Sequence, residues 1–458
     1  MALSAESRTT PLIQVSGATV PDKVNQDSGI KRLSKDSWLD EDPFDRQISA
    51  AKEVTRLGAT AELVVTQLGS GILLLPGAFS KAGIIPSLIV LLIVGATASN
   101  RAALLAECIE KSNDCARAPS SFVDVGRRAL GDSGEVAVSI SINGTLYCCC
   151  LAFLILIGTL LAQMFAIPGC SRPASEIVWK GIVSVLLLGA TFLGGMSELQ
   201  WLGVAGSLAT VLTGISIISA AMMETQAHHP THLVDVQMSD VISSITTFCY
   251  CFGAIQTMPM IARDMKDRQG DLVPAVHNAH IQSTLVFLLV GLIGYIGFGD
   301  GVTPQALNSL KDSYVFLWHL GSIGIIFHLA LAIPILMNMV SRSIEQRLRS
   351  KRWISVFCRS SLVLVLYLLS CTPIAIFADF VGVVPATTVT CNCFVWPAVI
   401  YWGLMRSEHG SFGLAVRHSP MRFLMDALIA GLALIAMIFG TTSAIQQLIS
   451  DMYSGQSR

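Results

Sequence analysis

The sequence predicts an all-α polytopic membrane protein with about eleven transmembrane helices. Hydrophobic residues make up 52% of its 458 residues, charged residues make up 13%, and the mean hydropathy is +0.62. Soluble domains carry roughly 25% charged residues, so this composition indicates a chain that lies largely in lipid. The net charge of −1 gives no reason to expect a nucleic acid as a partner.

Apolar stretches long enough to cross a bilayer recur along most of the chain. A transmembrane helix needs about 20 mainly apolar residues. This rule predicts spans at residues 57–80, 84–107, 137–167, 177–196, 199–223, 241–262, 279–298, 314–340, 356–378, 380–405 and 421–449. The ninth and tenth spans are separated only around Asp379, which leaves ten or twelve spans as alternatives.

The distribution of basic residues agrees with eleven spans. With the N-terminus in the cytosol, the inner segments hold 24 Lys and Arg residues and the outer segments hold 5. Cytosolic loops of membrane proteins carry such an excess. Arg101 lies inside the second span, close enough to its cytosolic end to snorkel toward water. An odd number of spans leaves a short exoplasmic C-terminus, residues 450–458.

The first 56 residues differ from the rest of the chain. They are polar, contain eight Lys or Arg residues and do not resemble a cleavable signal peptide. We therefore expect a disordered cytosolic tail over 1–56 and a membrane domain over 57–449.

The sequence gives little reason to expect a metal, a cofactor or an enzyme. Most of the 12 cysteines lie in apolar stretches, where thiols behave as small hydrophobic groups, and they lack the spacing of a metal site. His228, His229 and His232 fall in a polar loop that we expect to be solvated. We expect His277 and His280, ahead of the seventh span, to be interfacial. No nucleophile–base pair of a membrane enzyme is visible.

Glycines interrupt two of the predicted spans, and these spans lie five apart. The first contains Gly69-Ser70-Gly71 near its middle and the sixth contains Gly253, and each has a proline a few residues later. Transporters with inverted repeats bind their substrates where one helix of each repeat is broken in mid-membrane. The two interruptions therefore favour a secondary transporter over a structural membrane protein.

An amino acid suits a site between two broken helices. Its carboxylate can bind N–H groups at the positive end of a half-helix, and its ammonium can bind freed carbonyl groups. The candidate substrate-binding residues are Thr66, Gln67, Gly69, Ser70, Gly71, Tyr147, Phe248, Tyr250, Phe252 and Gly253. Glu62 is a candidate gate or proton carrier because carboxylates inside membranes are usually functional; alternatively, it pairs at the interface with Arg263 or Lys266.

At this point the sequence resembles a known family, the amino acid/auxin permeases of the amino acid–polyamine–cation superfamily. The resemblance covers about residues 52–449. It rests on GSGILLLPGAFSKAG (69–83), SFVDVGRRALGDSGE (121–135), GYIGFGD (294–300), IPILMNMVSRSIEQRL (333–348) and the FADFVGVVPATTV…FVWPAVIYWGLM segment, in this order. The sixth helix departs from the family because it lacks the histidine that many members carry ahead of the proline.

The resemblance implies a LeuT-like fold, with a 5+5 inverted repeat plus an eleventh helix, and transport of amino acids. Sodium-coupled relatives bind Na⁺ between the first and eighth helices, with an asparagine at the position of Val65 and a hydroxyl on helix eight. Here residues 328–334 contain neither Ser nor Thr, whereas His328 can carry a proton. We therefore predict transport driven by protons or by substrate alone, not by sodium.

Two further questions stay open at the level of sequence. Proton-driven transport fits either the plasma membrane or a vacuolar or lysosomal membrane. A sensor that keeps the carrier fold and signals through its cytosolic tail is the alternative to a transporter.

Overall fold

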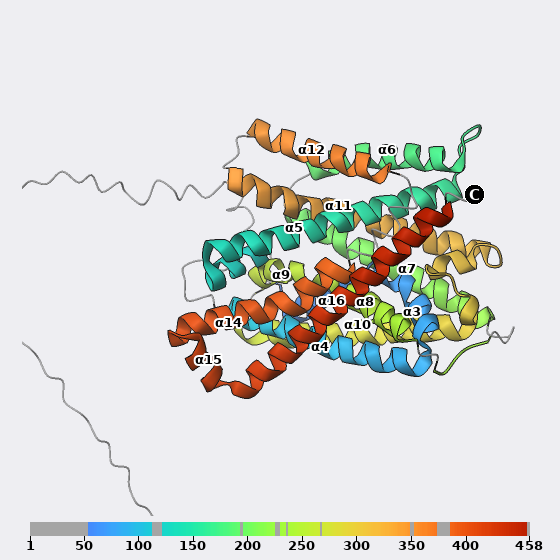
Figure 1. Cartoon of the computed structure of the whole chain (residues 1–458). Helices are drawn as coiled ribbons and strands as arrows, with labels where there is room; N and C mark the ends of the chain where they lie inside the picture. The colour runs from blue at the N-terminus through green and yellow to red at the C-terminus, as the bar shows by residue number, and fades with distance from the viewer. Residues whose placement is uncertain are drawn as a thin grey trace, which may run out of the picture. The chain divides into compact units, whose positions relative to one another are not determined.

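The fold was determined from a computed structural model of the whole chain (Figure 1). The structure describes residues 54–111, 121–192, 196–224, 230–234, 237–265, 268–348, 352–372 and 385–455. Most of the predicted tail, residues 1–53, lies outside this part. The described residues form helices joined by loops, apart from an isolated bridge between Val54 and Met265. The prediction of an all-α protein is confirmed.

The helices fall into two consecutive groups, each of which begins with a broken helix. The first group holds α2 (Arg56–Gln67), η2 (Ser70–Leu74), α3 (Leu75–Ala82), α4 (Ile84–Lys111), α5 (Phe122–Met164), α6 (Arg172–Thr191) and α7 (Met196–Glu224). The second holds α8 (Met238–Cys251), η5 (Gly253–Thr257), α9 (Met258–Asp264), α10 (Arg268–Phe298), α11 (Val315–Leu348), α12 (Arg352–Ser370), η8 (Pro385–Val389), η9 (Cys391–Val395) and α14 (Trp396–His409). Two short turns, η6 (Gly299–Gly301) and η7 (Ala306–Leu310), join α10 to α11.

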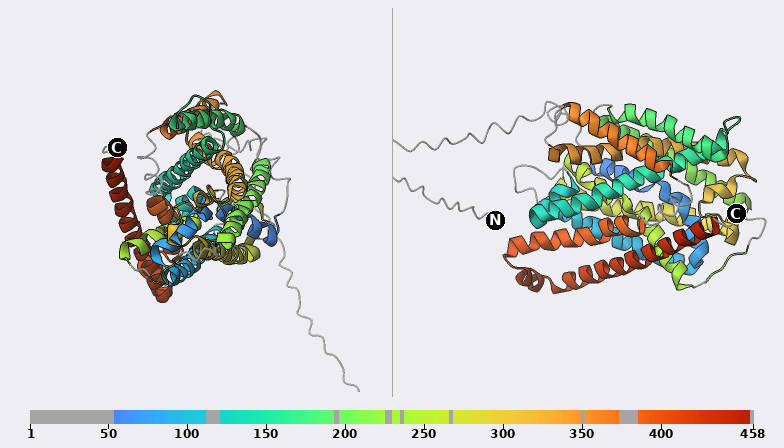
Figure 2. Two further views of the ribbon diagram at one scale, coloured as in Figure 1. Left: turned by 90° about the vertical axis from the view of Figure 1, so that its right-hand side faces the viewer. Right: turned by 45° about the horizontal axis from the view of Figure 1, so that its top comes forward.

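The chain then closes with α15 (Phe412–His418) and α16 (Pro420–Gly455). Figure 1 shows α16 starting beside the turn after α14 and running to the opposite end of the helices. In both views of Figure 2, α6 and α12 pack together on one side, next to α5.

Eight described helices are long and apolar enough to cross a membrane, or nine if the bent pair made by α2 and the η2–α3 segment counts as one span. Two predicted spans fall outside that number. One corresponds to α7, in which the apolar helical stretch Leu208–Glu224 is shorter. The other corresponds to α8, η5 and α9, each of which is short by itself because the span is broken. The chain is a multi-pass membrane protein, and eleven spans stay a prediction.

Two helices extend beyond the apolar stretches that predict them. α5 begins at Phe122, where the Ser121 hydroxyl accepts a hydrogen bond from the N–H of Asp124, and it consists of two helices joined at a kink at Gly131, whose φ of 73° and ψ of −162° are not helical. α10 begins at Arg268, so His277 and His280 both lie inside it. Because a helix continues wherever neighbouring helices bury one of its faces, a window of apolar residues underestimates its length.

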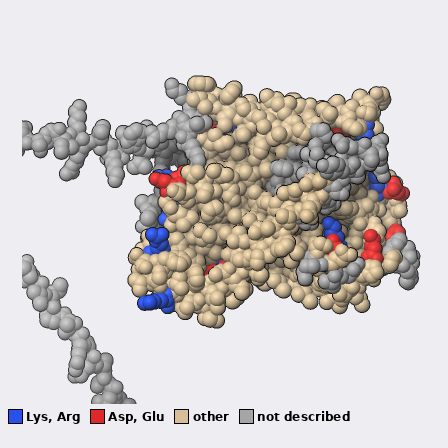
Figure 3. All heavy atoms as spheres, viewed as in Figure 1, with Lys and Arg blue, Asp and Glu red and all other residues tan. Residues whose placement is uncertain are grey.

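Charged side chains are concentrated toward the two ends of the helices on the face seen in Figure 3, with a broad uncharged band between them. Large apolar side chains are exposed on the helices, for example Leu428, Leu432 and Ile435 on α16. Such a continuous apolar surface is what a helix bundle presents to lipid.

Candidate functional site

The first broken helix loses its regular backbone at Leu68 and Gly69. α2 ends at Gln67, Leu68 has φ −76° and ψ 68°, and Gly69 is extended with φ −108° and ψ −150°. The chain resumes as the 3-10 turn η2 and then as α3, and the two arms meet at a bend of 47°. The predicted break at these glycines is confirmed. Since no side chain caps the start of η2, its positive end faces the break.

The second broken helix has a similar construction. α8 ends at Cys251, Phe252 leaves the helical conformation with φ −94° and ψ 17°, and the 3-10 turn η5 begins at Gly253. Pro259 then lies in the first turn of α9, where a missing N–H costs no helical hydrogen bond. No side chain caps the start of η5 either. The two spans are thus interrupted in the same way, each just before a short 3-10 turn.

The two breaks lie in contact with each other. The hydroxyl groups of Ser70 and Tyr250 are 2.7 Å apart, a hydrogen bond between η2 and α8. Opposite Gly71 the contact is closer still, because a Cβ there would stand 2.8 Å from Sγ and 3.2 Å from Cα of Cys251. Only glycine allows this approach of the two backbones. The structure therefore brings together Ser70, Gly71 and Tyr250 from segments about 180 residues apart.

Gly69 has more space around it than Gly71, whereas Gly253 is closely packed. A Cβ on Gly69 would meet only Nε2 of His328, at 3.6 Å, which is an ordinary van der Waals distance. A Cβ on Gly253 would lie 3.0 Å from the Val389 side chain in η8. Room for a ligand atom beside the first break is therefore largest at Gly69.

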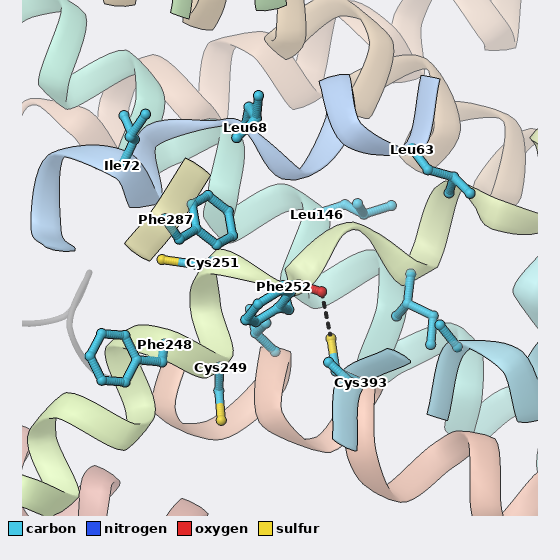
Figure 4. Close-up of a cluster of buried hydrophobic side chains, with 14 of the residues drawn as sticks. Leu63, Leu68, Ile72, Leu146, Phe248, Cys249, Cys251, Phe252, Phe287 and Cys393 are labelled. Carbon is cyan, nitrogen blue, oxygen red and sulfur yellow. Dashed lines mark hydrogen bonds between the residues drawn. The ribbon is translucent and has the colours of Figure 1, made fainter. Parts of the chain in front are cut away.

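The aromatic candidate residues contact different parts of the protein. Phe248 packs edge-on against Phe79 of α3, with ring centroids 5.9 Å apart, and Phe252 packs edge-on against Phe287 of α10 at 5.3 Å. Both rings are buried beside the breaks (Figure 4). The hydroxyl of Tyr147 on α5 instead donates to the Leu362 carbonyl of α12 at 3.0 Å, so the polar end of this side chain is bound to α12 and not to a break.

The polar residues before the first break have partners. The Thr66 hydroxyl donates to the Glu62 carbonyl, one turn earlier in its own helix, at 2.7 Å. Nε2 of Gln67 lies 3.1 Å from Nε2 of His280 on α10. His280 is 5% exposed, so its side chain is buried within the protein. The sequence-based analysis missed this contact because its partner Gln67 lies on another helix, 213 residues away.

His328 lies where three elements meet. Its side chain is buried in α11, its Nε2 faces Gly69, and a Cβ on Gly206 of α7 would be 3.4 Å from its Nδ1. Glu62 lies on α2, partly buried and more than one turn before the break. The structure thus brings His328 beside Gly69 of the broken segment, while Glu62 lies in the helix that leads to it.

A polar cluster next to the second break had no counterpart in the sequence analysis. Asn392 of η9 is fully buried; its Oδ1 accepts from the Ser141 hydroxyl of α5 at 2.6 Å, and its Nδ2 donates to Thr145 at 2.8 Å. The neighbouring Cys393 thiol donates to the Phe252 carbonyl at 3.7 Å, a contact drawn in Figure 4. These bonds fasten α5 and η9 together beside the broken part of α8. A buried asparagine in an apolar stretch was the signal available in the sequence.

Comparison with solved structures supports the fold. The chain is similar to MhsT, solved in complex with L-phenylalanine, with a TM-score of 0.52 and 14% identity over 86% of this chain and 99% of that one. It is also similar to a Na⁺-coupled sialic acid symporter in a substrate-bound outward-open state, with a TM-score of 0.51 and 13% identity over 90% of this chain and 92% of that one. The expected LeuT-like fold is confirmed.

Curated relatives and a family model identify the chain more closely. Amino acid transporter AVT1J of Arabidopsis thaliana is 27% identical over 342 residues, which cover 73% of this chain and 79% of that protein. Amino acid transporter AVT3A of the same plant is 23% identical over 402 residues, covering 85% and 89%. The model described as "Transmembrane amino acid transporter protein" matches residues 52–446. The chain therefore belongs to this family of membrane transporters, the amino acid/auxin permeases, and not to an enzyme family.

Proposed function

We propose that this protein is a secondary active transporter that carries amino acids through a site between its two broken helices. The observation that carries the proposal is the contact between the breaks, with Ser70 bound to Tyr250 and Gly71 packed on Cys251. Names of the relatives in Arabidopsis thaliana, such as amino acid transporter AVT1J, support the same substrate class.

The geometry suits a zwitterion. The uncapped start of η2 and the space beside Gly69 offer N–H groups to a carboxylate. The carbonyl end of α2, on the other side of the same break, carries partial negative charge and suits an ammonium group. The buried rings of Phe248 and Phe252 and the Tyr250 side chain then border the second break. Thr66, Gln67, Tyr147 and Gly253 are supporting candidates.

We further propose that transport is driven by protons or by substrate alone, and not by sodium. Na⁺ is a hard cation that requires several oxygen ligands. At the contact between the first break and α11, the side chain beside Gly69 is the imidazole of His328, and neither Val65 nor any of residues 328–334 has a side-chain oxygen. An imidazole can instead take up and release a proton. Glu62 is the second candidate carrier.

Uptake by the full chain in proteoliposomes tests both proposals. A panel of radiolabelled amino acids is offered with an inward pH gradient, and Na⁺ is replaced by choline at constant pH. We expect uptake of at least one amino acid and no change on Na⁺ replacement. Uptake that collapses in choline would overturn the coupling proposal. Binding without flux would favour the alternative, a sensor that signals through the cytosolic tail.

We propose that the N-terminal tail, residues 1–56, is cytosolic and that the C-terminus is exoplasmic. The excess of basic residues on the inner side supports this orientation. Either the plasma membrane or a vacuolar or lysosomal membrane supplies the proton gradient that the coupling proposal requires.

A further inference from the structure

His280 contacts both broken helices with one side chain. Its Nε2 lies 3.1 Å from Nε2 of Gln67, the last residue of α2 before the first break. Its ring lies nearly parallel to that of Phe252, the first residue after α8, with centroids 5.9 Å apart and an angle of 9° between the planes. The same Phe252 ring packs against Phe287 of α10. His280 is therefore placed to link the two breaks to α10.

The hydrogen bonds of His280 define its protonation. Nδ1 lies 2.8 Å from the carbonyl oxygen of Val276, which can only accept, so Nδ1 carries a proton. Nε2 faces the amide nitrogen of Gln67, which can only donate, so Nε2 has a free electron pair. The ring in this structure is neutral, with its proton on Nδ1.

This arrangement leaves one buried acceptor without a partner. Gln67 is 4% exposed, and its Oε1 has no hydrogen-bond partner. A buried polar atom without a partner is costly, and native proteins seldom keep one without a reason. The unpaired oxygen belongs to the same amide group whose nitrogen binds His280.

A second proton on His280 would make the present orientation of the Gln67 amide unfavourable and the opposite orientation favourable. Nε2 would become a donor and would face the amide nitrogen, which is also a donor. A half-turn of the Gln67 amide removes this conflict, because Oε1 then accepts from Nε2–H and is no longer unpaired. The same half-turn moves the NH₂ group to the position that Oε1 holds now. Protonation thus changes which group Gln67 presents just before Gly69.

Among the described residues, one titratable neighbour of His280 lies on its own helix. His277, one turn earlier in α10, interacts electrostatically with His280 and is bound to the Ser99 hydroxyl of α4 at 2.9 Å. On the elements packed against α10, titratable side chains include Glu62 of α2 and Arg101 of α4, which pairs with Asp426. Tyr250, two residues before Phe252, is bound to Ser70. Protonation of His280 therefore acts mainly through Gln67.

We propose that His280 and Gln67 form a proton-operated clamp that holds the first break against the second, and that the Gln67 amide turns over when His280 binds a proton. His280 is a positioning residue in this proposal, since it acts on the site through Gln67 and Phe252. The inference rests on the proposed transport function and adds a proton site distinct from His328.

Amino acid exchange at equal pH on both sides tests the clamp without a proton gradient as a driving force. We measure the KM of exchange over a pH range that extends well to the acid side, and we expect the wild-type value to change as His280 takes up its second proton. His280→Gln keeps a side chain that can form hydrogen bonds but cannot titrate, so its KM should be constant over this range. His277→Gln, which removes the exposed neighbour on the same helix, should keep the wild-type profile. A wild-type profile in His280→Gln would overturn the proposal.

A second variant and a second readout keep the test independent of transport. Gln67→Glu, whose carboxylate only accepts, should favour protonated His280 and shift the KM profile toward higher pH; an unshifted profile would contradict the clamp. In purified protein without substrate, the pH dependence of the thermal unfolding midpoint should change in His280→Gln and not in His277→Gln. If the midpoints of wild type and His280→Gln changed with pH in the same way, the clamp proposal would be overturned. A wild-type protein that exchanges no amino acid would contradict the proposed function instead.

Discussion

Glycine serves two different purposes at the first break. Gly71 is needed because its α-carbon packs directly on Cys251, where a Cβ would stand 2.8 Å from the thiol sulfur. Gly69 has no such neighbour, and its negative φ is accessible to any residue. A substitution at Gly71 should therefore disturb helix packing, whereas a substitution at Gly69, two residues earlier, should affect ligand binding.

Alanine at these positions should give different results. We expect Gly71→Ala to lower the free energy of unfolding by the amount typical of an overpacked core, about 1–3 kcal/mol, and so to lower the thermal unfolding midpoint. We also expect it to impair transport. Gly69→Ala should leave the midpoint unchanged and still reduce transport at least about tenfold, which corresponds to about 1.4 kcal/mol of lost substrate binding. Fluorescence-detected unfolding and proteoliposome uptake measure the two effects. Normal uptake by Gly69→Ala would remove this position from the site.

His328 allows a test of coupling at a single side chain. Its imidazole is buried against Gly69 and Gly206, while His319, on the same helix, bonds to the carbonyl of Val315 near the helix start. In His328→Gln we expect a pH gradient to lose its effect on accumulation while exchange of substrate continues, because exchange needs no net proton movement.

His319→Gln is the matched control and should accumulate substrate like the wild type. Unchanged proton-driven accumulation in His328→Gln would transfer the carrier role to Glu62.

Two ion pairs attach α16 to α4, and they differ in burial. Arg101 and Asp426 are 2.6 Å apart, with side chains 1% and 5% exposed, and Asp426 also accepts a hydrogen bond from the Trp402 indole at 2.9 Å. The expectation that Arg101 snorkels toward water is wrong, because its side chain is buried and pairs with Asp426 inside the protein. Glu107 and Arg422 form the second pair at 2.7 Å, with side chains 33% and 40% exposed.

Removal of one partner should reveal the difference between these pairs. Asp426→Ala leaves a buried guanidinium unpaired, for which we expect a loss of about 3–5 kcal/mol of stability. Glu107→Ala breaks an exposed pair on the same two helices and should cost less than about 1 kcal/mol. Unfolding midpoints of the two variants, compared with the double variant Arg101→Met/Asp426→Leu, measure these terms. Equal losses in the two single variants would contradict the assignment.

The whole molecule has a native marker for its orientation. Cys170 is exposed in the loop between α5 and α6, whereas the other cysteines that the structure describes are buried or partly buried. If the tail is cytosolic, this loop and the end of α16 lie on the exoplasmic side.

In sealed vesicles of known orientation, we expect a membrane-impermeant maleimide to label the wild type from the exoplasmic side and not to label Cys170→Ser. A tag after residue 458 should be accessible from the same side. Labelling of Cys170 from the cytosolic side, or protection of both termini on one side, would contradict the eleven-span orientation.

The sequence by itself determined the class, the family and the two breaks. These properties depend on local composition and on the positions of glycine and proline, which act through the backbone. A short stretch of sequence is therefore enough to predict them. Only the tertiary structure decided which polar side chains face one another. The sequence alone suggests that His280 is interfacial and that Arg101 snorkels, because it does not show that Gln67 and Asp426 lie beside them. A buried polar group is stable only with a partner, and these partners lie 213 and 325 residues away along the chain.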